Sequence, residues 1–507
     1  MNVLLLLLGA FVLIVCLCFL AFTGYVYHVH NKYSHIPTPK YSSFYKGHMQ
    51  QMIDSQKGDE EVFVLDLFFK WYQETDSKVY VIFFFWKAFV VVIDPSYTKE
   101  IIVQVKNNKP KDQADLVNQL FGERFLGNGL VSVPDYDTWK PRRKLYDPAF
   151  NKSYLKSLLP SFNKCVDVLL DSIRPLADGE TDVPMKQHLA ECTLYVISKV
   201  AFGSDFSDQW DDKSLGLKRA KGTGKLTFLI SNVFKGLMKR QKSPFFQYIH
   251  PFEAEAYRET VRAIRTIGRD CIKKRIAMVE RGVEVPNDIL THILGLASTK
   301  ETVSIEDLVD DFATFYIAGQ ETTGNLLTFA VAQLHLHPDI LARVQMEVDD
   351  VLGTKAEVTG EDLERLQYTE QVLLETLRMH PPVGGITKEL CTDTTLGDIT
   401  LPAGTMVFMG TILSSQMPEY FDDPDIFNPS RFDQENKQPS SFVYFPFGLG
   451  HRACIGKHFA MMEAKMILAR LIQTFKLTLP ENYKLVVVSR GTLQPKDDVP
   501  CKVELRL

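Results

Sequence analysis

Several patterns that mark common classes of protein are missing from this sequence. Its 507 residues contain no Gly/Ser-rich linker, low-complexity stretch or internal repeat. One large domain therefore fits the sequence at least as well as the roughly three that length alone suggests. A basic excess is also missing, since the net charge is −5 and the pI is about 6.2. Because nucleic-acid-binding domains are usually basic, this balance argues against a nucleic-acid partner.

Paired cysteines and nucleotide fingerprints are missing too. None of the eight cysteines belongs to a C-x-x-C pair. Scattered single cysteines are typical of small buried side chains in a reducing compartment, and Cys454 is the exception because of its neighbours. No G-x-G-x-x-G sequence is present either, so a flavin or nicotinamide cofactor would have to be carried by a separate protein.

The N-terminus is a long apolar run. Residues 3–22 carry no charge, and as a helix they would span about 30 Å, the thickness of the hydrocarbon core of a bilayer. A cleaved signal peptide would normally begin with basic residues, whereas the first Lys or Arg here is Lys32. We therefore expect an uncleaved transmembrane helix over residues 1–25, a proline-containing linker over 26–40, and a large cytosolic domain over 41–507.

The remaining periodicity predicts a mainly α fold with small β-sheets. Residues 79–94 are rich in β-branched and aromatic side chains and predict two strands with a turn near 86–87. Most segments over residues 155–352 have helical periodicity. Short β-like pieces return around residues 400–409 and 484–488. The sheets are thus expected near the two ends of the domain.

The best-defined helix is predicted over residues 305–336. Ser304 is a suitable N-cap, Glu306 and Asp307 place negative charge in the first turn, and His337-Pro338 ends the pattern. A helix of about thirty residues spans some 45 Å, enough to cross the whole domain. We therefore expect it to be central.

A loop with a single cysteine is the most specific pattern. Residues 447–456 read FGLGHRACIG, followed by a strong helical pattern over 458–472. Gly448 and Gly450 can adopt backbone conformations that turn amides towards one sulfur. The positive end of the following helix would favour a thiolate at Cys454. An inert structural thiol is the alternative.

A second pattern, AGQETT over residues 318–323, lies inside the long helix. Gly319 weakens a helix, and Thr322 tends to bond the carbonyl four residues earlier, so the two together predict a local kink. Glu321 beside this hydroxyl suggests proton transfer. The alternative is an acidic turn on a solvated helix face.

Two further pairs have helical spacing. Glu375 and Arg378 share a helix face at i, i+3, and are either an ordinary surface pair or a buried support together with Arg431. Trp139 and Arg143 are one turn apart and could both reach an anionic group. Pro141 between them requires this to be the first turn of a helix. The basic residues Lys140, Arg142 and Lys144 form either a solvated face or a docking patch for an acidic electron donor.

These motifs, in this order, resemble the cytochrome P-450 family from Trp139 to Gly456. The resemblance implies the cytochrome P-450 fold and a haem b group, with Cys454 as the thiolate ligand of the iron and a donor that favours O–O cleavage. Glu321 and Thr322 would be the catalytic residues of oxygen activation. Other residues that it implies contact haem are Trp139, Arg143, Lys388, Phe447 and Arg452. The structural residues are Glu375, Arg378 and Arg431.

Within the family, several stretches resemble the cholesterol 24-hydroxylases, among them residues 121–132, 312–322 and 444–456. Gly384 departs from the bulky residue of that group, and Lys388 replaces an Arg, so a roomier pocket is expected. The predicted pocket positions are all uncharged: Phe121, Thr314, Ile317, Ala318, Val383, Gly384, Ile386 and Thr492.

The resemblance implies a monooxygenase that uses O2 to hydroxylate a lipophilic substrate, with the side chain of a sterol such as cholesterol as the leading candidate. Electrons would come from NADPH through a separate NADPH–cytochrome P-450 reductase, at the endoplasmic reticulum membrane. Alternatives are a fatty-acid or xenobiotic hydroxylase, a haem-thiolate isomerase, and a haem or sterol sensor without turnover. Residues 226–252, apolar and basic, predict a further segment at the membrane surface. The alternative is a core helix pair with an exposed loop.

Overall fold

The computed structural model describes residues 2–55, 64–104, 109–204, 225–243, 245–297, 304–436 and 438–506. The chain forms two compact units. Unit 1 contains Met1–Asn108, Gly385–Met417 and Ser440–Tyr444, and unit 2 contains Lys109–Gly384, Pro418–Pro439 and Phe445–Leu507. Unit 1 holds a small sheet and the N-terminal helix, whereas unit 2 is mainly helical.

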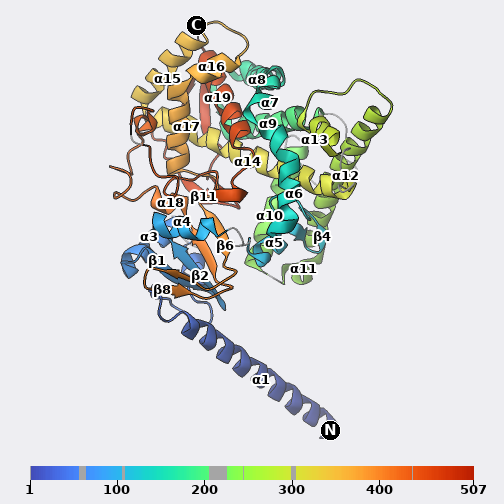
Figure 1. The fold of residues 1–507 in the computed structure, drawn as a ribbon, viewed down its shortest axis with the longest axis vertical. Coiled ribbons are helices and arrows are strands. Elements are labelled where there is room, and N and C mark those ends of the chain that lie inside the picture. Colours follow the sequence, from blue (N-terminus) through green and yellow to red (C-terminus); the bar gives the residue numbers. More distant parts are fainter. Residues whose placement is uncertain are drawn as a thin grey trace. The chain divides into compact units, whose positions relative to one another are not determined.

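Helix α1 (Asn2–Lys32) is the N-terminal element of unit 1 (Figure 1). Its described apolar side chains over residues 3–20 are exposed, and among the described residues it alone is long and apolar enough to cross a membrane. The helix continues through part of the predicted linker and ends at Lys32, before Pro37. An N-terminal anchor is consistent with this helix.

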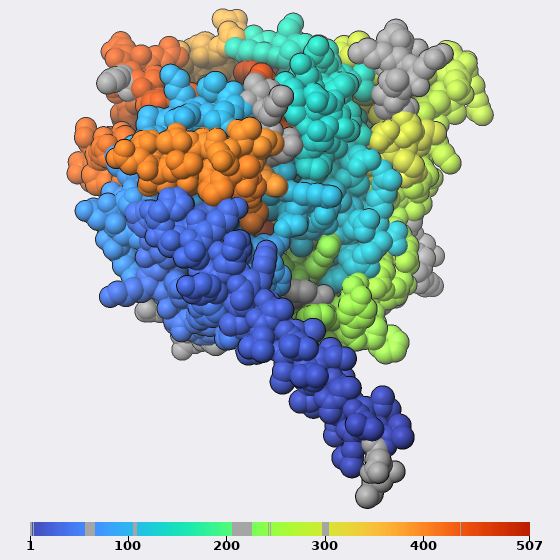
Figure 2. Space-filling model, turned by 60° about the horizontal axis from the view of Figure 1, so that its bottom comes forward, coloured from blue at the N-terminus to red at the C-terminus, as the bar shows by residue number. Residues whose placement is uncertain are grey.

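A four-stranded sheet forms the centre of unit 1. Strands β1 (Val79–Phe84) and β2 (Lys87–Val92) are an antiparallel hairpin. The predicted turn was one residue too late, since Phe84 pairs with Lys87 and Phe85 has a φ of 55°. The order is β1-β2-β9-β6, in which β9 (Met406–Met409) runs parallel to β2, and β6 (Ile386–Glu389) antiparallel to β9. Figure 2 shows the two longer chain segments of this unit, blue and orange, side by side.

Shorter elements complete unit 1. They are α2 (Met49–Ser55), α3 (Val64–Thr75), α4 (Pro95–Val103), β7 (Thr394–Leu396), β8 (Ile399–Leu401) and α18 (Thr411–Ser414).

Unit 2 is built from helices with small sheets. The helices are α5 (Lys111–Asn118), α6 (Tyr136–Tyr146), α7 (Lys152–Ser157), α8 (Leu159–Ile173), α9 (Met185–Val196), α10 (Lys225–Lys242), α11 (Phe246–Ile249), α12 (Pro251–Glu280), α13 (Ile289–Ala297), α14 (Ile305–Leu336), α15 (Pro338–Val351), α16 (Gly360–Arg365), α17 (Gln367–Met379) and α19 (Lys457–Thr474). The strands are β3 (Gln119–Leu120), β4 (Glu123–Arg124), β5 (Asp178–Pro184), β10 (Phe475–Thr478), β11 (Val487–Ser489), β12 (Leu493–Pro495) and β13 (Pro500–Leu505). Strand β5 lies within the region predicted as mostly helical, and pairs with β13.

Helix α14 is the predicted long helix, with the predicted boundaries. The Ser304 hydroxyl accepts from the Asp307 amide and the Asp307 side chain accepts from the Ser304 amide, which is a capping box. Its side chains are buried along most of its length, because α9, α12, α17 and α19 pack against it (Figure 1). The helix is therefore the central element of unit 2.

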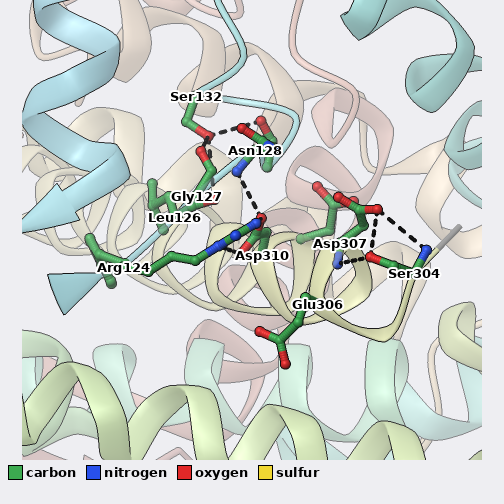
Figure 3. Close-up of polar contacts among 12 residues, drawn as sticks. Arg124, Leu126, Gly127, Asn128, Ser132, Ser304, Glu306, Asp307 and Asp310 are labelled. Atoms are coloured by element: carbon green, nitrogen blue, oxygen red, sulfur yellow. Dashed lines mark hydrogen bonds and ion pairs between the residues drawn. The ribbon is translucent and has the colours of Figure 1, made fainter.

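A buried carboxylate ties the first half of α14 to its neighbours. Arg124 Nη2 and Arg265 Nη1 donate to the two oxygens of Asp310 at 2.6 and 2.7 Å, and the amide of Asn128 donates at 2.7 Å. Figure 3 shows Arg124 and Asn128 directed at this carboxylate. We call Asp310, Arg124, Arg265 and Asn128 the Asp310 cluster. It fixes the loop before α6, and helix α12, on α14.

Candidate functional site

The cysteine loop has the backbone that its glycines predict. Gly448 and Gly450 have φ values of 73° and 67°, in the left-handed region that favours glycine. The amide of Cys454 donates to the carbonyl of Phe447 at 2.7 Å, which closes the loop. Helix α19 begins three residues after Cys454, with Gly456 as its N-cap. The loop thus presents one thiol at the start of a long buried helix.

The environment of this thiol differs from the prediction in one respect. The amide of Gly456 and the charge of Arg143 lower the pKa of Cys454, but burial outweighs both and raises it above its usual value. Metal binding by a cysteine requires the deprotonated sulfur, so a bound iron would favour the thiolate further. The side chain is nevertheless solvent-accessible. The thiol is thus accessible to a ligand although the groups around it desolvate it.

Three residues predicted to contact haem propionates lie together. The guanidinium groups of Arg452 and Arg143 stack over the Trp139 ring, 4.7 and 5.9 Å from its centre. Arg143 Nη1 also donates to the carbonyl of Ala453 at 2.8 Å, which joins α6 to the cysteine loop. The hydrogen-bond acceptors of Arg452 are the carbonyls of Val133 and Pro134, and burial lowers its pKa to about 10. A desolvated cation with uncharged acceptors is suited to an anionic ligand.

Helix α6 corrects two predictions. Pro141 is the sixth residue of the helix rather than part of its first turn, so one backbone hydrogen bond is lost inside the helix. Arg142 is not part of a solvated basic face, because it donates to Asp307 and Asp311 at 2.8 and 2.5 Å. Lys140 and Lys144 are exposed as expected.

The middle of α14 is the part of this helix that is open. Ala318 is exposed and Ile317 and Gly319 are half-buried, although both halves of the helix are otherwise buried. One turn later, the Thr322 hydroxyl donates to the carbonyl of Ala318 at 2.6 Å, as predicted. The helix continues through this turn without interruption. The turn therefore presents a small exposed apolar surface followed by a hydroxyl.

Glu321 is held by a hairpin distant in sequence. The Thr492 hydroxyl donates to Glu321 Oε1 at 2.7 Å, and Oε2 is buried without a hydrogen-bond partner among the described residues. Burial raises the pKa of Glu321 to about 7, while Thr492 and the charge of Lys186 act in the opposite direction. A carboxyl group with a pKa near neutrality can both take up and release a proton.

Glu375 and Arg378, which we call the E-x-x-R pair, are buried. This excludes the alternative of an ordinary surface pair. Arg378 makes a bidentate pair with Glu375, with distances of 2.8 and 2.9 Å, and both side chains are fully buried. Arg431 Nε and the amide of Asn428 donate to the same carboxylate at 3.3 and 2.9 Å. These contacts fix the loop around residue 428 on α17, so the three residues support the structure.

The other predicted pocket residues, and the predicted haem contacts Phe447 and Lys388, divide into several groups. Phe121 is buried in a stack with Phe246 and Tyr257, with ring centres 5.5 and 5.9 Å apart. Thr314 is buried and donates its hydroxyl to the carbonyl of Asp310 at 2.9 Å. Val383 is 50% exposed, and Gly384 and Phe447 are half-buried. Ile386 and Lys388 lie on β6 of unit 1, opposite Met409 and Val407.

Sequence reasoning missed polar residues that support the middle of α14. Asn325 Nδ2 donates to the Thr492 hydroxyl at 3.0 Å. On the side of α9, the Thr193 hydroxyl donates to the carbonyl of Gln320 at 2.9 Å. Asn325 is four residues after Glu321 and therefore on its face, which is the one signal that the sequence offered.

The residues of unit 2 fit the haem that the resemblance implies. Cys454 offers an accessible thiol, Arg452 a desolvated cation, and Ala318 an exposed apolar surface in the middle of a buried helix. An apolar macrocycle with anionic side chains and a central iron requires these three properties.

Comparisons with known proteins agree with this geometry. The chain is 29% identical to "Cytochrome P450 72A68" of Medicago truncatula over 81% of this chain and 78% of that protein. It is 30% identical to "11-oxo-beta-amyrin 30-oxidase" of Glycyrrhiza uralensis (81% and 77%), and 31% identical to "Secologanin synthase 1" of Catharanthus roseus (80% and 77%). These plant relatives do not support narrowing the resemblance to the cholesterol 24-hydroxylases.

A solved structure and a family model complete the comparison. The haem domain of a cytochrome P450DA mutant has the same fold, with a TM-score of 0.79 at 24% identity over 93% of this chain and 98% of that one. The family model "Cytochrome P450" matches residues 39–499. The cysteine loop is residues 447–456, and we call Glu321 and Thr322 of α14 the acid–threonine turn. With both in place, the chain belongs to the cytochrome P450 family and is a monooxygenase of that family.

Proposed function

We propose that this monooxygenase inserts one oxygen atom into an aliphatic C–H bond of a neutral polycyclic lipid, with the side chain of a sterol as the leading candidate. The observation that carries the proposal is the exposed apolar surface at Ala318, one turn before Glu321 and Thr322. A substrate seated there would lie against apolar atoms and next to the groups that transfer protons.

The chain's own residues have distinct roles in this proposal. Cys454 would ligate the iron, and Trp139, Arg143 and Arg452 would hold the propionates by stacking and charge-assisted hydrogen bonds. When bound, the haem supplies the activation of dioxygen and the oxidising power. Lys388 of β6 and Phe447 remain proposed haem contacts.

Proton delivery is assigned to the acid–threonine turn. The hydroxyl of Thr322 holds a proton at Oγ1, close to the carbonyl of Ala318. Glu321, with a pKa of about 7, exchanges protons near neutral pH and supplies them towards this hydroxyl. Closure around an apolar substrate would exclude other water from the site.

The preference for a neutral lipid follows from the pocket residues. None of the eight predicted pocket positions carries a charge, and the Thr314 hydroxyl is already bonded to a carbonyl. A fatty-acid carboxylate would require a cationic partner when buried. The relative named for the oxidation of 11-oxo-beta-amyrin, a triterpenoid, is consistent with a bulky polycyclic substrate. Because such carbons offer no polar handle, steric contacts would select the oxidised carbon.

A membrane location at the endoplasmic reticulum, with the domain in the cytosol, is proposed from α1 and a second surface. Phe245, Tyr248, Ile249 and Phe252 are 64–91% exposed, next to the basic residues at the end of α10. Such a surface is suited to insertion between lipid headgroups. Lys140 and Lys144 remain candidates for docking NADPH–cytochrome P-450 reductase.

The haem-thiolate assignment is tested by Cys454→Ser. The reduced wild-type protein with carbon monoxide should show the red-shifted Soret band of thiolate ligation, and the variant should lose it. A normal red-shifted band in the variant would falsify the assignment.

The substrate is tested with purified enzyme, reductase and NADPH. Cholesterol and a neutral triterpenoid should shift the spectrum of the ferric protein and give hydroxylated products, whereas a long-chain fatty acid should give neither. Turnover of the fatty acid alone would overturn the neutral-lipid proposal and leave the monooxygenase class intact.

A further inference from the structure

Thr492 lies at the tip of the β11–β12 hairpin, which is fixed on three sides. The amide of Leu493 donates to the carbonyl of Pro382 at 2.9 Å. Gly491 has a φ of 94° and approaches the Phe234 ring of α10 so closely that a Cβ would collide with it. Thr492 itself meets α14 through Asn325 and Glu321. The tip therefore joins the segment before β6, with its exposed Val383, to the acid of α14.

The direction of the hydrogen bonds at Thr492 is determined by Asn325. The Asn325 amide donates to the Thr492 oxygen at 3.0 Å. A hydroxyl has one hydrogen, and with its oxygen already accepting from Asn325 this hydrogen is free to point to Glu321 Oε1, 2.7 Å away. Thr492 thus acts as a donor to Glu321. The second oxygen, Oε2, is buried without a partner among the described residues, so it is free to receive or release a proton.

We propose that Thr492, held by Asn325, is a positioning residue for proton delivery: it aims Glu321 and keeps this carboxyl group able to exchange its proton at neutral pH. The proposal rests on the role of Glu321 in the proposed function. It adds that the hairpin tip, predicted from the sequence only as part of the substrate pocket, also controls the acid.

The charges around the acid support this role. Burial raises the pKa of Glu321 to about 7, and the donor Thr492 opposes that rise, because a hydrogen bond to a carboxylate stabilises the ionised form. Without the donor the carboxyl group would stay protonated at neutral pH and could not accept the next proton.

Two titratable side chains reach this region from neighbouring helices. Lys186, at the start of α9, lowers the pKa of Glu321. Its Nζ is held by the carbonyl of Pro495, at the end of the same hairpin, at 2.8 Å. Glu463 of α19 is buried beside Thr323, and burial raises its pKa well above the usual value. Lys186 is thus the cation through which the hairpin also influences Glu321.

The test compares Thr492→Val, which keeps the shape and removes the hydroxyl, with Thr492→Ser, which keeps the hydroxyl. The protonation of Glu321 is followed in the resting ferric holoenzyme by infrared difference spectroscopy over pH, and the carboxyl band is assigned by its loss in Glu321→Gln. We expect the midpoint near pH 7 to be retained in Thr492→Ser and to rise by about one pH unit in Thr492→Val. An unchanged midpoint in Thr492→Val would overturn the proposal.

A second readout uses turnover. In Thr492→Val, the pH profile of product formed per NADPH should move to higher pH by the same amount, with more hydrogen peroxide released at neutral pH. A lower yield with an unshifted profile would indicate a purely structural role. If Thr492→Val does not fold, as judged by the carbon monoxide spectrum, Asn325→Leu takes its place and should shift the midpoint in the same direction. The infrared midpoint needs no substrate, so its failure is distinguishable from failure of the substrate assignment.

Discussion

Asp310 and Glu321 lie on the same helix, eleven residues apart. Eleven residues are about three turns, so the two carboxylates point to nearly the same side, roughly 16 Å apart along the axis. Asp310 is fully buried and accepts hydrogen bonds from two arginines and a backbone amide. Glu321 accepts one hydrogen bond from a hydroxyl, and its other oxygen has no hydrogen-bond partner among the described residues.

The different partners of the two carboxylates give them different roles, one in stabilising the structure and one in proton transfer. A buried carboxylate that is paired with arginines fixes the segments that carry them in place. A buried carboxylate without an ion-pair partner has a raised pKa and can exchange protons. The sequence around each acid does not show how many donors surround it, because those donors are distant along the chain. Their partners come from other segments.

The largest expected effect is at Asp310. Asp310→Asn keeps the shape and removes the charge, which leaves Arg265, with a side chain 5% exposed, partly uncompensated. We expect a loss of about 3–5 kcal/mol in the free energy of unfolding. Thermal and denaturant unfolding of the holoenzyme, followed by the haem absorbance, measure it. A loss below about 1 kcal/mol would show that the Asp310 cluster does not hold the loop before α6.

Glu321→Gln should have the opposite sign and depend on pH. The folded-state pKa of about 7 lies above the usual 4.5, so the stability linked to this carboxyl is present below pH 4.5 and lost as pH rises through 7. The variant removes this loss and should be more stable by on the order of 3 kcal/mol at pH 8 and by less than about 1 kcal/mol at pH 5. Melting curves at both values test it. Equal differences at both would contradict a raised pKa.

Thr193→Val examines the support of the acid–threonine turn from α9. The change removes the buried hydroxyl that donates to the Gln320 carbonyl, which should cost about 1 kcal/mol of stability. It should also lower the product formed per NADPH, because the carbonyl that it holds is adjacent to Glu321. Thr193→Ser is the control and should keep the product formed per NADPH at the wild-type value. If the product formed per NADPH stays at the wild-type value in Thr193→Val, α9 does not position this turn.

The smallest effect is expected at Glu306, a partly exposed acid near Asp310. Arg269 and Arg265 lower its pKa to about 2, so its contribution is present above pH 4.5 and lost as pH falls towards 2. Because the side chain is 44% exposed, solvent screens the pairs, and Glu306→Gln should cost less than about 1 kcal/mol at pH 7. A cost as large as that of Asp310→Asn would remove the distinction between buried and exposed acids.

Local patterns made the cysteine loop and α14 predictable. Gly448 and Gly450 require a particular backbone, and Ser304 and Pro338 mark helix boundaries through interactions within a few residues. The E-x-x-R pair was also predicted, with its partner Arg431 known only from the family resemblance.

Contacts between distant segments were not predictable from such patterns. Thr492 and Glu321 are 171 positions apart, and periodicity gives no information on which hydroxyl meets which acid. Arg142 illustrates the same limit, since its lysine-rich neighbours suggested a solvated face, whereas its partners lie on α14. The family's order of motifs supplied the topology that the residues alone did not.

The parallel pairing of β2 with β9 has a consequence for synthesis of the chain. Phe89 pairs with Met406, so the β1–β2 hairpin must wait while more than 300 further residues are made, on the order of 15–60 s at ordinary translation rates. During that time an apolar strand edge is unpaired, and such edges promote association with other chains. Long-range pairing of this kind also slows folding. The N-terminal part of the protein is thus made first but completed nearly last, and the interval is when the nascent chain has most need of a chaperone.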